Sequence, residues 1–308
     1  MSSDRNYQTK LKNEIAHYQD VFKNTLLQKV PDSWNLVEHH FSQRIKRQTG
    51  TTGVAPYIGR YFQGRRKIEL LGLGSGACGP ELEGIVPELK KNNINVRLSC
   101  LDINRSALNI AAKEATKRKV TFKKIVVDIN RYRFPKNKFD VIVAYASLHH
   151  FDNLDHVTKG ICQSLKPNGI FITIDIPTKN GYLMWPETYR LVSLLWQILP
   201  PQFKIDHTKH AQPTFAPNYE NIDYSKTSFE CQNSEKILFY LKQNLKQLSY
   251  VPGMSISRRF FDTKFGPNYN IRRVLDKSII NFILHLDDYL LDRGYLKPET
   301  FFGVYKKI

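Results

Sequence analysis

The segment Lys67-Ile-Glu-Leu-Leu-Gly-Leu-Gly-Ser-Gly-Ala-Cys78 decides how this chain folds. An apolar run typical of a buried strand ends in three glycines, Gly72, Gly74 and Gly76, and a helix-like sequence follows. Glycine permits a close approach of the backbone to a ligand, and a helix N-terminus presents unpaired N–H groups. The segment therefore predicts a ligand-binding turn between a strand and a helix. Several kinds of nucleotide cofactor bind to such turns, so the surrounding sequence has to distinguish between them.

Apolar runs and helix-like segments alternate after this turn. We expect strands at residues 68–71, 96–101, 121–127, 139–144 and 169–174, and helices at residues 80–91, 105–118 and 154–165. This order is typical of βαβ units and of a parallel sheet covered on both faces. The predicted fold class is α/β, with a Rossmann-like sheet.

Two regions depart from the alternation. Residues 1–60 are rich in helix-like patterns and are predicted to form an N-terminal helical cap. Residues 61–308 are predicted to form the main domain, with a cap inserted at about residues 177–250, where Pro, Tyr, Trp and Asn are frequent. Helices are expected at residues 183–199, 234–248 and 274–292, and a last strand at 300–305. We favour one domain with an insertion, because a strand-like pattern follows the irregular region.

The chain is strongly basic, with 46 Lys and Arg against 28 Asp and Glu, a net charge of +18. Such a charge is compatible with binding to nucleic acid, but also with solubility alone, because the basic residues are spread along the sequence. No apolar run reaches the roughly 18–20 residues of a membrane span. The polar N-terminus does not resemble a secretory signal. The four cysteines lack metal-ligand spacing, so we expect no metal and a cytoplasmic location.

Acidic residues follow two of the expected strands. Asp102 ends the second strand, where a carboxylate can accept hydrogen bonds from both hydroxyls of a ribose. A helix N-cap is its alternative role. Asp128 and Ile129 end the third strand, where they would offer a polar partner and an apolar wall to an adenine. Asp128 is alternatively a turn former.

Two further motifs complete an ordered set, Phe139-Asp-Val-Ile-Val-Ala-Tyr-Ala-Ser-Leu-His-His150 and Leu165-Lys-Pro-Asn-Gly169. Over residues 67–176 the chain resembles the class I S-adenosylmethionine (SAM)-dependent methyltransferases. The resemblance implies a SAM site that contains Gly72, Gly74, Gly76, Asp102, Asp128, Ile129 and Ala146. The C-terminal half resembles some stand-alone bacterial members, which often act on sugars or secondary metabolites. The implied reaction is methyl transfer to an oxygen or nitrogen atom of a small molecule.

One position departs from the family pattern. The family usually has an acidic residue two positions before the first loop glycine, where it contacts the amino-acid end of SAM. Leu70 holds that position here, and Glu69 lies one residue further away. The sequence therefore leaves open how the amino group of SAM would be bound.

Candidate catalytic and substrate-binding residues lie after the fourth and fifth strands. His149 and His150 follow a strand end, where either imidazole could act as a general base or serve a structural role. Methyl transfer also proceeds without a strong base when the two reactants are well aligned. Tyr182 and Trp185 could line a substrate pocket or belong to the core. Glu230 could contact substrate or interact favourably with the dipole of the helix that follows it.

Three other functions compete with small-molecule methylation. A nucleic-acid methyltransferase is supported by the charge, but the sequence has no NPPY-like strand end and no Pro-Cys nucleophile. A non-catalytic SAM-binding protein is supported by the missing acid at Leu70. An NAD-dependent oxidoreductase is disfavoured by Asp128. The sequence leaves the oligomeric state open.

Overall fold

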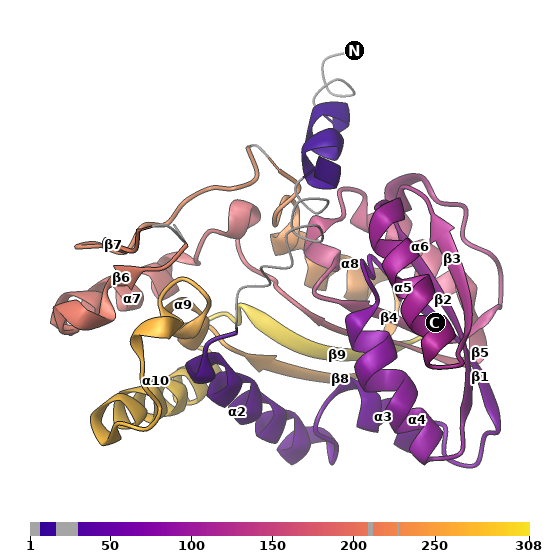
Figure 1. The fold of residues 1–308 in the computed structure, drawn as a ribbon, viewed down its shortest axis with the longest axis horizontal. Coiled ribbons are helices and arrows are strands. Elements are labelled where there is room, and N and C mark those ends of the chain that lie inside the picture. The colour runs from indigo at the N-terminus through magenta and orange to yellow at the C-terminus, as the bar shows by residue number, and fades with distance from the viewer. Residues whose placement is uncertain (1–6, 17–29, 209–211, 227) are drawn as a thin grey trace.

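A seven-stranded sheet forms the centre of the computed structural model, which describes residues 7–16, 30–208, 212–226 and 228–308. The strand order is β3-β2-β1-β4-β5-β9-β8 (Figure 1). The strands are β1 (Lys67–Leu73), β2 (Asn95–Asp102), β3 (Thr121–Val126), β4 (Phe139–Tyr145), β5 (Leu165–Asp175), β8 (Lys246–Gly253) and β9 (Thr300–Lys306). β1 to β5 pair in parallel, whereas β9 is antiparallel to both β5 and β8. The predicted α/β fold class and its five parallel strands are confirmed.

The strand order reverses between β1 and β4, which pair with each other at the centre of the sheet. Both strands are almost entirely buried, which explains their continuous apolar sequences. Open parallel sheets bind ligands beyond the carboxyl ends of the strands at such a reversal. The loops that follow β1 and β4 are therefore the expected position of a site.

Helices cover both faces of the sheet. They are α2 (Asp32–Thr49), α3 (Val54–Tyr61), α4 (Val86–Lys91), α5 (Arg105–Lys117), α6 (Leu154–Ser164), α7 (Pro186–Ile198), α8 (Ile237–Asn244), α9 (Ser257–Phe261) and α10 (Val274–Asp292). One apolar cluster joins α2, α3, α4, α5 and α10 to the sheet, and a second joins α6 and α8 to it. Among the helices of the described residues, none combines the length and apolar character that crossing a bilayer requires.

The N-terminal region packs directly on the sheet. Phe41 and Ile45 of α2 and Ile58 of α3 belong to the same buried cluster as Ile68 and Leu70 of β1. Residues 7–16 form a further helix, which lies near the top of Figure 1. Residues 17–29, also part of the predicted cap, lie outside the described residues. The division at residue 60 stays a prediction.

Three sequence predictions differ from the structure in their bounds. The helix predicted at 80–91 is divided into a π-helix, η1 (Pro80–Ile85), and α4. The helix predicted at 234–248 ends at Asn244, because Leu245 is extended and β8 starts at Lys246. A bulge between Gln247 and Ser249 hides the strand alternation there. β5 begins at Leu165, before the Lys166–Gly169 turn that was predicted to precede it.

Candidate active site

A cavity of about 710 Å³ lies at the carboxyl ends of the parallel strands, and we call it the first cavity. Five carboxylates line it, those of Glu14, Glu83, Asp102, Glu114 and Asp128. None of the described lining residues is a lysine or arginine. The lining residues of the first cavity are therefore acidic on balance, in a chain whose net charge is +18. Outside the lining, Arg118 pairs with Glu83 and Glu114, and Arg131 pairs with Asp128.

Two of the three predicted glycines line the first cavity. Gly74 and Gly76 both have positive φ, +59° and +51°, a conformation that other residues rarely adopt. A Cβ at Gly74 would also lie 2.8 Å from the Cβ of Ser147. Gly72 is buried at the end of β1 instead, and a Cβ there would collide with the side chains of Ser75 and Glu81. Gly72 thus has a different role from Gly74 and Gly76.

Asp102 lines the first cavity and fixes the glycine turn. The Gly76 N–H donates a hydrogen bond to Asp102 Oδ2 at 2.8 Å, and the Asn104 N–H donates to Oδ1 at 2.7 Å. Asn104, not Asp102, caps α5, because its Oδ1 accepts from the N–H groups of Ser106 and Ala107. Burial raises the pKa of Asp102 above its ordinary value. The capping role considered for Asp102 therefore belongs to its neighbour.

Asp128 and Ile129 also line the first cavity, as does Ala146. Asp128 Oδ1 accepts from the Asn130 N–H at 2.9 Å, and Oδ2 accepts from the Tyr7 hydroxyl at 2.7 Å. Ala146 follows β4 with a φ of +48°. The predicted cofactor residues other than Gly72 thus meet around one cavity.

The N-terminal helix of residues 7–16 contributes a wall that the sequence did not predict. Leu11, Glu14 and Ile15 line the first cavity, and Phe229 lines it from the region between β5 and β8. The Tyr7 and Phe229 rings meet edge to face at 5.2 Å. These contacts join segments that are far apart in sequence, so no local pattern predicts them.

Glu81 is a further residue of this region that no sequence motif indicates. Its side chain lies under the glycine turn, beside Gly72 and Ser75, and the residue is only 2% exposed. Burial raises its pKa from 4.5 to about 7. Glu81 Oε2 has no hydrogen-bond partner among the described residues. Glu81 belongs to the π-helix η1, a rare element that often occurs at functional sites. Leu70, by contrast, is buried in the core.

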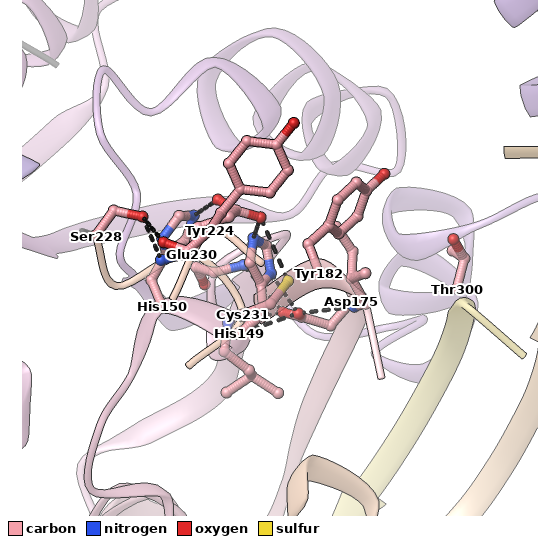
Figure 2. A network of polar contacts seen from close by, with 12 residues as sticks. His149, His150, Asp175, Tyr182, Tyr224, Ser228, Glu230, Cys231 and Thr300 are labelled. Atoms are coloured by element: carbon pink, nitrogen blue, oxygen red, sulfur yellow. Dashed lines mark hydrogen bonds and ion pairs between the residues drawn. The ribbon is translucent and has the colours of Figure 1, made fainter. Parts of the chain in front are cut away.

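His149 lies in a buried polar network between Asp175 and Glu230 (Figure 2). His149 Nδ1 is 2.7 Å from Asp175 Oδ1, and Nε2 is 3.8 Å from Glu230 Oε1. Burial would raise the pKa of Asp175, but the His149 imidazole and nearby N–H donors lower it below its ordinary value. His149, Glu230 and Cys231 also have donor atoms within 4.8 Å of one another, a set that could hold a metal ion. The expectation of no metal stays a prediction.

His150 faces the first cavity, which His149 does not line. His150 Nδ1 is 3.0 Å from Glu14 Oε1, and Nε2 is 3.7 Å from Glu230 Oε2. Burial lowers the pKa of His150, but these two carboxylates outweigh it and raise the pKa above the ordinary value. Glu230 therefore lies between the two candidate bases, although it lines neither this cavity nor the next.

A second cavity of about 530 Å³ adjoins the first, and Pro80 and Ala146 line both. Residues of α2 and α3, the ends of β4 and β5, and Arg258 and Thr300 form its walls. The predicted substrate residue Tyr182 lies behind this wall, where its hydroxyl accepts a hydrogen bond from Arg258 Nε at 2.9 Å. Trp185 lines neither cavity, and the Lys297 ammonium lies 4.1 Å from its ring centroid.

Comparisons with known proteins agree with this geometry. Residues 72–173 match a family model described as "Methyltransferase domain". The chain is 30% identical over 115 residues to the sterol 24-C-methyltransferase of Aspergillus fumigatus, covering 37% of this chain and 29% of that protein. It is 28% identical over 120 residues to the demethylmenaquinone methyltransferase of Leptospira interrogans, covering 36% of this chain and 47% of that protein. The match thus spans less than half the length of either relative.

Solved structures with a similar arrangement include the geranyl diphosphate C-methyltransferase of Streptomyces coelicolor. That structure has a TM-score of 0.45 and 11% identity, over 82% of this chain and 76% of the other. The phosphoethanolamine N-methyltransferase 2 of Haemonchus contortus has a TM-score of 0.46 and 12% identity, over 87% of this chain and 56% of that chain. The family model thus identifies residues 72–173 as a methyltransferase domain, the region that contains the glycine turn and strands β2 to β4.

Proposed function

We propose that this protein transfers the methyl group of SAM to an oxygen or nitrogen atom of a small molecule. The observation that carries the proposal is the charge of the first cavity, which five carboxylates line and no described lysine or arginine. SAM presents a sulfonium and an ammonium cation, which an acidic cavity favours. The diphosphate of NAD would be repelled in the same place, which disfavours the oxidoreductase alternative.

In this proposal each end of SAM has its own partners. Asp102 binds the ribose hydroxyls, and Asp128 and Ile129 bind the adenine, while the turn at Gly74 and Gly76 approaches the cofactor closely. Glu81 takes the role of the acid that is missing at Leu70. Its support is the unpartnered Oε2 beneath the glycine turn, where an ammonium group would satisfy a buried carboxylate.

The second cavity is proposed to hold the methyl acceptor. Its volume of about 530 Å³ is within the range of small-molecule pockets, and it meets the first cavity at Ala146. The two curated relatives are named for a sterol and for demethylmenaquinone, which supports a small apolar acceptor. Catalysis would consist mainly of alignment and exclusion of water, because the sulfonium charge disappears during transfer.

Thermal unfolding with SAM, S-adenosylhomocysteine and NAD tests the cofactor. We expect the first two to raise the melting temperature and NAD to leave it unchanged. An absence of stabilisation by SAM and S-adenosylhomocysteine would remove the main proposal. Incubation with labelled SAM and either a metabolite extract or total RNA then tests the acceptor. Label in RNA, with salt-sensitive binding, would favour the nucleic-acid alternative that the net charge of +18 supports.

A further inference from the structure

We infer that the second cavity accepts an apolar molecule that carries an oxyanion, a carboxylate or a phosphate ester, and that Arg258 binds this oxyanion. The inference rests on the proposed function, because it assigns the acceptor half of the same site. It adds the chemical class of the acceptor, which neither the family nor the glycine turn specifies.

Apolar side chains form most of the second cavity. Phe41 and Ile45 come from α2, Val54 from α3, Ile174 from β5, and Met254 follows β8. All but Ile174 are less than 9% exposed. Such a surface favours a hydrocarbon or aromatic body over a sugar.

Arg258 is the only cationic residue among the described residues that line the second cavity. Its guanidinium lies 5.5 Å from the ring centroid of Trp34 and 5.7 Å from that of Tyr182. Nε donates to the Tyr182 hydroxyl at 2.9 Å, and Nη1 donates to Thr300 Oγ1 at 3.2 Å. These contacts hold the guanidinium at the cavity wall in a defined orientation.

Arg258 forms no direct ion pair, and the buried Asp262, which interacts with it electrostatically, interacts with Arg259 as well. Among the described residues, no carboxylate lies within 4.0 Å of its guanidinium, whereas the neighbouring Arg259 pairs with the buried Glu299. The two carboxylates that line the same cavity have other contacts: Asp175 pairs with His149, and Glu38 accepts from Trp34 Nε1. A largely buried cation is costly unless it is paired.

The donors that remain on Arg258 match an oxyanion. A guanidinium has five N–H groups, and the two contacts above use two of them. The rest include both N–H groups of Nη2, so a carboxylate or phosphate in the cavity could accept a charge-assisted pair. The apolar walls would then bind the remainder of the same molecule, and the nucleophilic atom would face Ala146.

Isothermal titration of the protein saturated with S-adenosylhomocysteine tests the inference with octanoate, octyl phosphate and octanol. The three probes share one alkyl chain and differ only in the head group. We expect at least one anion to bind about tenfold or more tightly than octanol, and the tighter of the two anions identifies the oxyanion. Arg258→Leu should abolish this preference, and Arg258→Lys should retain part of it. Arg190→Leu, which removes an equal charge on the exposed side of α7, should retain all of it.

Binding of S-adenosylhomocysteine to each variant shows that it is folded. Equal affinities for octanol and both anions, no binding of any probe, or an unchanged preference in Arg258→Leu would overturn the inference. The proposed function fails in a different way, by loss of S-adenosylhomocysteine binding in the unaltered protein.

Discussion

Asp175 Oδ1 lies 2.7 Å from His149 Nδ1, and neither side chain is more than 4% exposed. Asp175 Oδ2 also accepts hydrogen bonds from the N–H groups of Ser147 and Leu148. One carboxylate at the end of β5 therefore holds the loop that follows β4. That loop includes Ala146, which lines both cavities, and His150, which lines the first.

Asp175→Asn should destabilise the protein by about 3 kcal/mol, because the amide has one acceptor oxygen fewer for the buried N–H groups that the carboxylate binds. Urea denaturation measures the free energy of unfolding. Glu220→Gln, at an exposed position, is the control and should be nearly neutral. Equal stability of the two variants would show that Asp175 does not hold the loop.

Glu81→Gln should lower the affinity for SAM by about tenfold or more, because the amide no longer offers a negative charge to the ammonium group of SAM. The same variant should bind 5′-methylthioadenosine as the unaltered protein does, since that nucleoside lacks the amino-acid end. Calorimetric titration of both ligands gives the comparison, with Glu88→Gln of α4 as the control. An equal loss of affinity for both ligands would show that Glu81 does not bind the amino-acid end of SAM, and that it acts elsewhere in the site or only stabilises the fold.

The unliganded protein should lose stability as the pH rises from about 4.5 to about 7. Burial raises the pKa of Glu81 from 4.5 to about 7, so in this window the folded state binds more protons than the unfolded state. By linkage the free energy of unfolding then falls, by on the order of 3 kcal/mol in total. Urea denaturation across this range should give a flatter profile for Glu81→Gln. SAM affinity should rise over the same window, as Glu81 ionises.

Asp102→Ala should lower the affinities for SAM and 5′-methylthioadenosine alike, because both ligands contain the ribose. We expect a loss of about tenfold or more, since Asp102 also positions the Gly76 and Asn104 N–H groups. Asp102→Asn retains one acceptor oxygen and should lose less. Calorimetry with the two ligands separates this result from that of Glu81→Gln. Unchanged affinity for both ligands would exclude Asp102 from the cofactor site.

His149→Ala should leave SAM affinity unchanged, because His149 does not line the first cavity, and should lower kcat by about 100-fold through loss of a general base. The acceptor for this assay comes from the methyl-incorporation screen. His150→Ala is the paired variant, because His150 lines the first cavity and His149 does not. Full turnover by His149→Ala would remove the base assignment from that residue. Weakened SAM binding by His150→Ala would assign it to the cofactor site.

The parts of the site that the sequence predicts are those with local signals. Gly74 and Gly76 belong to one turn, and Asp102 and Asp128 each follow a strand, so chain order and strand ends were enough to place them. The positions of β1 and β4 are predictable because buried parallel strands are apolar along almost their whole length.

Residues brought together by tertiary packing were not predictable in this way. Glu14 and Phe229 both line the first cavity, although they lie far apart in the sequence. Glu81 belongs to a segment predicted as an ordinary helix, whereas the structure has a π-helix there. Its carboxyl group fits under the glycine turn because Gly72 has no side chain to occupy that space. Arg258 lies in a short helix whose sequence carries no motif. The network of His149 likewise depends on Asp175, a strand-end acid that the sequence analysis did not single out.

Ala146 has a consequence for regiochemistry. It lines both cavities, so in the proposed reaction a methyl group passing from one to the other would travel beside it. An acceptor bound at Arg258 would present only one of its atoms at the junction of the two cavities beside Ala146. The distance between Arg258 and Ala146 would then determine which atom of the acceptor is methylated. Acceptors would then be selected by the length between their acid group and their nucleophile, more than by the outline of the rest of the molecule.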